Sequence, residues 1–201
     1  LKDAADRISE RTNGVVTVNV YPNNTFGDPN SWVDATNADA PIISVASFPA
    51  WDDKYPEADA LQAGFVWESP EEIIRFYDTD LCKKIIADLD EQNIHSLNAP
   101  IAAGMRHVIG RAAYSTPEAI KGLKLRTVNG KAWLECFQAM GASPMGMASS
   151  EQLSALSAGT IDALDQSINL IYSTKSYELV KDVTLLAQQP LWDAMFCSTK
   201  W

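Results

Sequence analysis

Apolar residues recur along this 201-residue chain with two spacings, one typical of helices and one typical of strands. Residues 1–11 carry an apolar stripe at helical spacing, and residues 15–21 alternate between apolar and polar side chains until Pro22. The longest helical pattern covers residues 70–92, where Pro70 suits the first turn. The first half of the chain is therefore predicted to contain both helices and strands.

The same two patterns alternate through the rest of the chain. Further helices are expected over residues 31–36, 117–121, 130–140, 149–158 and 169–179, and further strands over 41–46, 95–99, 105–109, 123–128, 161–164, 183–186 and 194–198. This alternation predicts an α/β fold with largely parallel sheets, whose ligands lie at the carboxyl ends of strands. The rhythm changes between Ala99 and Gly104, which indicates a domain boundary.

Composition narrows the class of protein. Hydrophobic residues make up 46% of the chain and charged residues 21%, as in a soluble globular protein with a hydrophobic core. The net charge of −10 argues against a nucleic acid or an anionic membrane as partner, because both require a basic surface. An anionic small molecule is still compatible with this charge, since one arginine pocket can be locally positive.

The cysteines and histidines suggest neither a metal centre nor a cofactor. Cys82, Cys136 and Cys197 are far apart in the chain, and only two histidines are present. No secretory signal and no apolar run of membrane-spanning length is found. The chain opens on Leu1 within a helical pattern, so we expect that both ends have been cut and that any signal peptide has been removed.

The stretch from Ser115 to Arg126 is predicted to form a short helix and a strand that ends in an arginine. Ser115 or Thr116 can cap a helix, Gly122 can end it, and a short strand then leads to Arg126. A guanidinium in such a position can bind a carboxylate through two parallel hydrogen bonds. Taken alone, however, the segment fits a surface turn with a solvated arginine better.

Several other residues could contribute to a site. Trp51, close to Phe48, and Trp192 could stack on a ligand or pack in the core, whereas Trp133 has core spacing. Asn129 could bind a ligand or shape a turn. Two carboxylates, Asp162 and Asp165, could serve an enzyme, but no histidine or nucleophile motif accompanies them, so a structural role is favoured.

The order of motifs resembles a known family, the periplasmic solute-binding proteins of tripartite ATP-independent (TRAP) transporters, which bind C4-dicarboxylates and related acids. The motifs that carry the resemblance are Gly104-Met105-Arg106, Thr116-Pro117-Glu118, Gly122-Leu123-Lys124-Leu125-Arg126, Gly141-Ala142, Pro144, Glu151, Ala155-Leu156, Gly159 and Ile161-Asp162. The resemblance implies a two-lobed α/β fold with a ligand cleft between the lobes. It implies that residues 1–100 form part of lobe I, 101–190 lobe II, and 191–201 a hinge strand that returns to lobe I.

The resemblance also assigns residues. Arg126 matches the arginine that clamps the substrate carboxylate, Arg106 matches a second arginine, and Gln166 matches a ligand-contacting side chain. Asp165 and Ser149 depart from the family, which usually has a glutamate and an aromatic residue at these positions. Family members are also longer than this chain.

The function that the resemblance implies is capture of a small organic acid in the periplasm and its delivery to the membrane subunits of the transporter. Such a protein is not an enzyme and works as a monomer. Two other functions stay open: an α/β enzyme that processes a small molecule, and a ligand-binding module of a sensor.

Overall fold

The computed structural model describes residues 1–22, 25–27, 29–47, 56, 60–97 and 101–201. Its helices are α1 (Lys2–Arg11), α2 (Pro29–Asn37), α4 (Pro70–Tyr77), α5 (Asp80–Glu91), α6 (Pro117–Ile120), α7 (Lys131–Ala139), α8 (Gln152–Ser157), α9 (Ile168–Thr174) and the 3₁₀ helix η2 (Ser176–Glu178). Its strands are β1 (Ser44–Ser47), β2 (His95–Ser96), β3 (Ile101–Gly110), β4 (Lys124–Thr127), β5 (Ser143–Gly146), β6 (Ala163–Ser167), β7 (Asp182–Thr184) and β8 (Pro190–Cys197).

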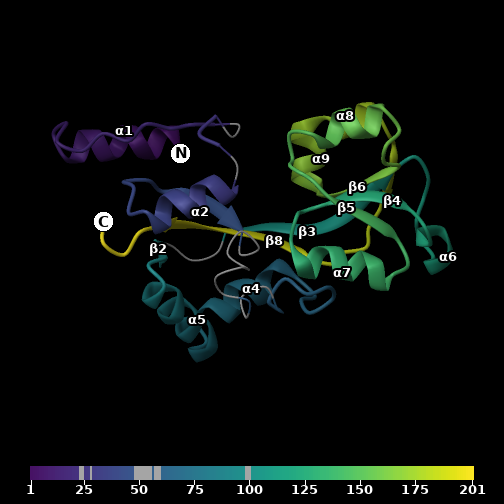
Figure 1. Ribbon diagram of the computed structural model, residues 1–201, viewed down its shortest axis with the longest axis horizontal. Coiled ribbons are helices and arrows are strands. Elements are labelled where there is room, and N and C mark those ends of the chain that lie inside the picture. The colour runs from purple at the N-terminus through teal and green to yellow at the C-terminus, as the bar shows by residue number, and fades with distance from the viewer. Residues whose placement is uncertain (23–24, 28, 48–55, 57–59, 98–100) are drawn as a thin grey trace.

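These strands form one sheet in the order β1-β8-β3-β6-β4-β5, with β2 beside β8 and β7 beside β3. The first residues of β3 pair with β8, and its last five residues pair with β6 and β7. Figure 1 shows α2, α4 and α5 around one half of the sheet and α6 to α9 around the other, with β3 and β8 running between the halves. No helix in the described part of the chain has both the length and the apolar character to cross a membrane.

The prediction of largely parallel sheets is wrong. Among the described strands, only β4 forms parallel ladders, with β5 and β6, whereas every ladder of β3 and β8 is antiparallel. Alternation of helices and strands predicted crossover connections throughout. It could not show that the chain returns from β7 to the first half of the sheet as β8, beside β3 and opposite to it in direction.

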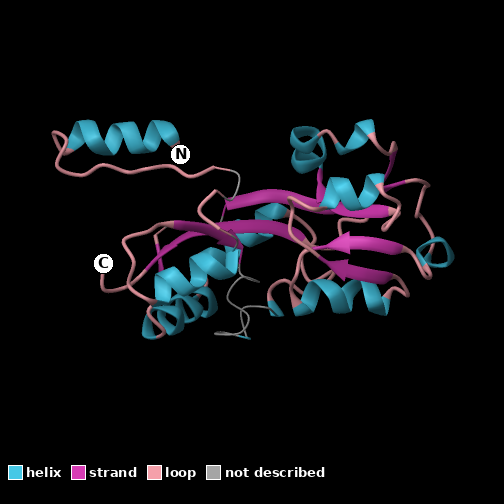
Figure 2. Cartoon of the chain, turned by 45° about the horizontal axis from the view of Figure 1, so that its top comes forward, coloured by secondary structure: helices cyan, strands magenta, loops and turns pink. Residues whose placement is uncertain are grey.

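The N-terminal region differs from the rest of the molecule. Helix α1 confirms the predicted helix, but the strand expected over residues 15–21 is absent and Val15 is 86% exposed. Figure 2 shows this segment as a loop that runs beside α1, away from the sheet. Alternating side chains stabilise a strand only when a neighbouring strand accepts its backbone hydrogen bonds, and no described strand pairs with this segment.

The long helix expected over residues 70–92 is two helices, α4 and α5. Thr79 begins the second one, because its hydroxyl accepts a hydrogen bond from the backbone N–H of Cys82 at 3.2 Å. A threonine between two helical patterns is thus a cap here, and the apolar spacing continues across it because both helices pack on the same core.

Two hydrophobic clusters define the two faces of the sheet around β3, β4 and β6. Val108, Leu125 and Ala163 lie on one face and pack with Phe137 of α7, so we call this the α7 face. Ile109 and Leu164 lie on the other face and pack with residues of α8 and α9, so we call this the α8–α9 face. Side chains alternate between these faces along each strand.

Candidate functional site

The segment before β4 delivers Arg126 as the sequence predicts. The Thr116 hydroxyl accepts a hydrogen bond from the Ala119 N–H at 3.3 Å and caps α6. Gly122 has a φ of 73°, a conformation that favours glycine at the end of a helix. Strand β4 follows and places Arg126, only 4% exposed, next to Leu164 of β6 on the α8–α9 face.

The guanidinium of Arg126 has little to neutralise it. Its Nε and Nη2 both donate to the backbone carbonyl of Met147, at 3.1 and 2.8 Å, and it forms no ion pair with a carboxylate in the described part of the chain. Burial, together with the nearby charge of Arg106, lowers the pKa of Arg126 to about 10, although Asp165 acts in the opposite direction. A buried cation without a counterion is costly, so this position is suited to receive an anion.

Arg106 is also buried, but it is neutralised. It lies on β3 opposite Ser167 of β6, and its Nε is 3.0 Å from both carboxylate oxygens of Asp165. Its Nη2 donates to the backbone carbonyl of Asp165, and the ring of Trp133 lies 4.9 Å from its Cζ. Strand register puts these contacts on the α7 face, so the side chains of Arg106 and Arg126 lie on opposite faces of the sheet.

Asp165 is the centre of this second arrangement. Besides Arg106, it accepts hydrogen bonds from the Thr127 hydroxyl at 2.7 Å and from Nε2 of Gln188 at 2.8 Å. Asp162, the other acid of the possible enzymatic pair, is partly exposed and lies 3.8 Å from Arg111. The carboxylate of Asp165 is therefore occupied by structural contacts, as the sequence analysis favoured.

Gln166 lies on the same face as Arg126. Its Nε2 donates to Gln152 at 3.1 Å, and its Oε1 accepts from the Ser176 hydroxyl at 2.7 Å. Gln152 in turn donates to Ser149, an exposed residue before α8, at 3.1 Å. Gln166 and Ser149 are thus joined through one amide on the side of the sheet that holds Arg126.

The remaining predicted site residues lie elsewhere. Asn129 is exposed and packs against Gly146 of β5, where a Cβ would come within 2.7 Å of the Asn129 Oδ1, and its contact with a ligand stays a prediction. Trp192 is fully buried in the core beside Trp67 and Phe76, at 5.8 and 6.3 Å between ring centroids. These contacts are core packing, and a ligand contact of Trp192 stays a prediction. Phe48 and Trp51 lie outside the described residues.

Sequence analysis missed the partners of Asp165. The expected strand over 161–164 is β6 at Ala163–Ser167, so Asp165 and Gln166 lie within a strand rather than in a turn. Thr127 and Asp165 share a face because Leu125 pairs with Ala163 and side chains alternate along each strand. Predicting this contact would have required both the bounds of β6 and its register with β4. Nothing in the sequence marks Gln188. Trp133 is fully buried, as predicted, and it also covers Arg106.

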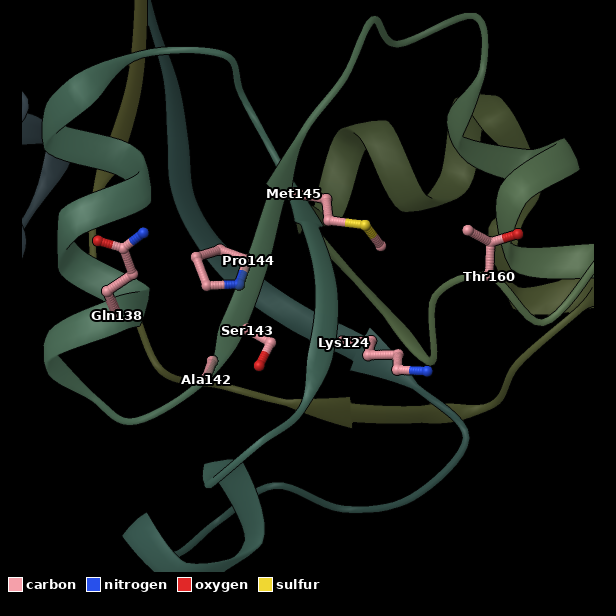
Figure 3. Close-up of a pocket in the computed structure, with 7 residues that line it drawn as sticks. All are labelled: Lys124, Gln138, Ala142, Ser143, Pro144, Met145 and Thr160. Atoms are coloured by element: carbon pink, nitrogen blue, oxygen red, sulfur yellow. The ribbon is translucent and has the colours of Figure 1, made fainter.

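A surface hollow of about 520 Å³ lies along β5, at the edge of the sheet (Figure 3). Its lining residues are Lys124, Gln138, Ala142, Ser143, Pro144, Met145 and Thr160. Neither buried arginine lines it, so it is separate from the Arg126 position. Within the described residues, no group of three histidine, cysteine or acidic side chains could hold a metal ion.

Known proteins share this architecture. A TRAP periplasmic solute-binding protein from Desulfovibrio salexigens, solved with diglycerolphosphate, superposes with a TM-score of 0.94 at 30% identity, covering 99% of this chain and 65% of that one. A TRAP solute-binding protein from Actinobacillus succinogenes, solved with L-galactonate, gives 0.89 at 25% identity over 97% and 65% of the two chains. These matches confirm the two-lobed, periplasmic-binding-protein-like α/β fold.

Relatives found by sequence similarity are also periplasmic binding proteins. The 2,3-diketo-L-gulonate-binding periplasmic protein YiaO of Escherichia coli is 26% identical over 90% of this chain and 55% of its own length. The C4-dicarboxylate-binding periplasmic protein DctP of Vibrio cholerae is 25% identical over 97% of this chain and 58% of its own length. The chain thus spans somewhat more than half the length of these relatives. The family model described as "Bacterial extracellular solute-binding protein, family 7" (DctP) matches residues 1–201, and the chain belongs to this family.

Proposed function

We propose that the full-length protein is the solute-binding component of a TRAP transporter, which captures a small organic acid and delivers it to the membrane subunits. Family membership indicates a periplasmic location and a transport role rather than catalysis. We also expect the protein to act as a monomer, which light scattering would test.

One observation supports the proposal. Arg126 is a buried cation, and its only hydrogen-bond acceptor among the described residues is one backbone carbonyl. Two N–H groups of the guanidinium point to Met147, and no described residue accepts a hydrogen bond from Nη1 or from the second N–H of Nη2. A ligand carboxylate there would supply the missing charge and accept parallel hydrogen bonds. We therefore assign Arg126 the main ligand contact.

The neighbours of Arg126 favour an acid with further oxygen atoms. Gln166 and Ser149 lie on the same side. Beyond their printed hydrogen bonds, Gln166 has a second amide N–H and Ser149 has its hydroxyl hydrogen to donate. Two of the four relatives named above were found with L-galactonate or are named for 2,3-diketo-L-gulonate, which are a hydroxy acid and a keto acid. The other two were found with diglycerolphosphate or are named for C4-dicarboxylates. By analogy, we propose a hydroxy, keto or sugar acid as ligand, with Phe48 and Trp51 as candidates for its apolar face.

Two strands offer a route for lobe closure. In this proposal residues 1–100 belong to lobe I, 101–190 to lobe II, and 191–201 to the returning strand. Strands β3 and β8 pair with each other and reach both halves of the sheet. Gly104, with a φ of 99°, lies where the register between them shifts, and such a place can absorb a hinge motion.

A thermal-shift screen of the full-length protein tests the function. The panel contains D-gluconate, D-glucuronate, D-glycerate and L-malate, with D-glucose and glycine betaine as neutral and zwitterionic controls. A ligand at 100 times its dissociation constant stabilises a protein by about 2.7 kcal/mol. We expect stabilisation by at least one acid and by neither control. Stabilisation by the controls alone would overturn the proposal, and mass spectrometry of co-purified small molecules would identify the natural ligand.

A further inference from the structure

We infer that the anion site carries one net positive charge and therefore selects singly charged organic acids over doubly charged ones, an inference that rests on the proposed function. The family match itself covers relatives named for C4-dicarboxylates as well as for sugar acids, so it does not decide between these charges. The contacts of the two buried arginines decide between a singly and a doubly charged ligand.

Arg106 contributes no free charge to a ligand. Its Nε is 3.0 Å from both oxygens of Asp165, its Nη2 is bound to the carbonyl of the same residue, and its side chain is almost completely buried. The ring of Trp133 covers one face of the guanidinium. A cation and an anion in direct contact act on a third charge as a dipole, whose field falls off faster than that of a free cation.

Asp165 is itself held in place. The Thr127 hydroxyl and the Gln188 amide donate to its two oxygens, from β4 and from the segment before β8. A ligand carboxylate would have to break this buried network to take Arg106 for itself. Breaking a buried, hydrogen-bonded ion pair is strongly unfavourable, so Asp165 positions Arg106 and keeps it neutralised.

Two further titratable groups of the described chain, His107 and Asp193, add no positive charge to this network. His107 lies on the α8–α9 face, its Nδ1 accepts a hydrogen bond from the Ala187 N–H at 3.1 Å, and burial lowers its pKa, so the ring is neutral near pH 7. Asp193 on β8 lies close enough to Arg106 for that cation to lower its pKa, although burial raises the pKa overall. Neither group therefore supplies an unpaired cation for a second carboxylate on the ligand.

Matched ligand pairs test this inference. D-glucarate differs from D-gluconate, and tartronate from D-glycerate, by a carboxylate in place of a terminal CH₂OH group. In calorimetric titrations of the full-length protein at pH 7.5, we expect the monocarboxylate to bind about 30-fold or more tightly than its dicarboxylate counterpart, because the second charge is desolvated without a partner. Equal or tighter binding of the dicarboxylate would overturn the inference and leave the proposed function intact. If no acid of either pair or of the thermal-shift panel bound, the proposed function would fail, and the inference with it.

Two variants assign the selectivity to Asp165. Asp165→Asn keeps the shape of the side chain but leaves Arg106 without a counterion, so the preference for the monocarboxylate should shrink at least about tenfold. The double variant Arg106→Gln/Asp165→Asn restores the wild-type net charge and should keep the wild-type preference. Loss of the preference in a folded double variant would overturn the inference, and this result can be obtained even if the single variant does not fold.

Discussion

The α7 face and the α8–α9 face of the same sheet each bury an arginine, and the two arginines are held in opposite ways. Arg106, 1% exposed, has a carboxylate, a carbonyl and an aromatic ring around it. Arg126, 4% exposed, has one carbonyl among its described partners. Burial alone therefore does not distinguish Arg106, which is paired within the fold, from Arg126, for which we propose ligand binding. The presence of a counterion distinguishes them, because an arginine that already pairs with a carboxylate gains little free energy from binding a second carboxylate.

This difference also changes what each arginine does for the fold. The Arg106–Asp165 pair joins β3 to β6, and hydrogen bonds from Thr127 and Gln188 connect it to β4 and to the segment before β8. Among the described residues, Arg126 bonds to the loop after β5 and forms no such cross-links. Substituting the two arginines in the same way should therefore lower stability in one case and affinity in the other.

The largest expected effect is on stability, from Arg106→Met. Methionine keeps much of the buried volume but leaves Asp165 without its cation, which costs about 3–5 kcal/mol for a buried pair broken on one side. Urea unfolding of the full-length protein measures this loss. Arg106→Met/Asp165→Leu is the control, since replacing both charges by apolar groups is often neutral or stabilising. A single variant as stable as the wild type would contradict the structural role of this pair.

The matched substitution Arg126→Met should act on binding instead. Loss of the charged hydrogen bonds to a carboxylate costs about 2–5 kcal/mol, a loss of roughly 30- to several-thousand-fold in D-gluconate affinity by calorimetry. Stability should stay within about 1 kcal/mol of the wild type or rise, because an uncompensated buried charge is removed. Arg126→Lys should also bind poorly, since an ammonium lacks the planar fork. Unchanged affinity in folded Arg126→Met protein would remove Arg126 from the site.

Local features of the Arg126 segment were readable from the sequence, and those of Arg106 were not. Thr116, Gly122 and the short strand are neighbours in the chain, so capping and turn chemistry predict where Arg126 lies. Arg106 owes its environment to Asp165, which is 59 residues away and reaches it only through the register of β3 and β6. Resemblance to the family named both arginines as ligand contacts but could not show that one of them is neutralised.

The fold was predictable to a similar depth. Helix and strand patterns gave the α/β class and most elements, because each depends on short-range spacing. These patterns failed where strand pairing determines the structure. Residues 15–21 form no strand because no described strand lies beside them, and the antiparallel direction of β8 relative to β3 cannot be seen in short-range spacing. The edge strand β5 was missed altogether, since Pro144 in its middle argues against a strand except at the edge of a sheet.

A smaller effect is expected at Thr127, which belongs to the α7 face although it follows Arg126 directly. Thr127→Val removes a hydrogen bond to a buried carboxylate, so unfolding free energy should fall by about 1.5–3 kcal/mol, while D-gluconate affinity stays close to that of the wild type. Thr127→Ser keeps the hydroxyl and serves as the control. Equal stability of the valine and serine variants would show that this hydroxyl does not support Asp165.

The smallest effect concerns pH, and it separates the two arginines without mutation. Burial and the charge of Arg106 lower the pKa of Arg126 to about 10, so its positive charge is lost as the pH rises through that value. Because the carboxylate of D-gluconate stays ionised, affinity should be constant from pH 7 to 9, fall by about half near pH 10, and then fall further with each pH unit. Calorimetric titration measures this, with circular dichroism at each pH as the control for folding. A flat profile through pH 10.5 in folded protein would mean that Arg126 keeps its proton, and that its buried charge is better compensated than its described contacts show.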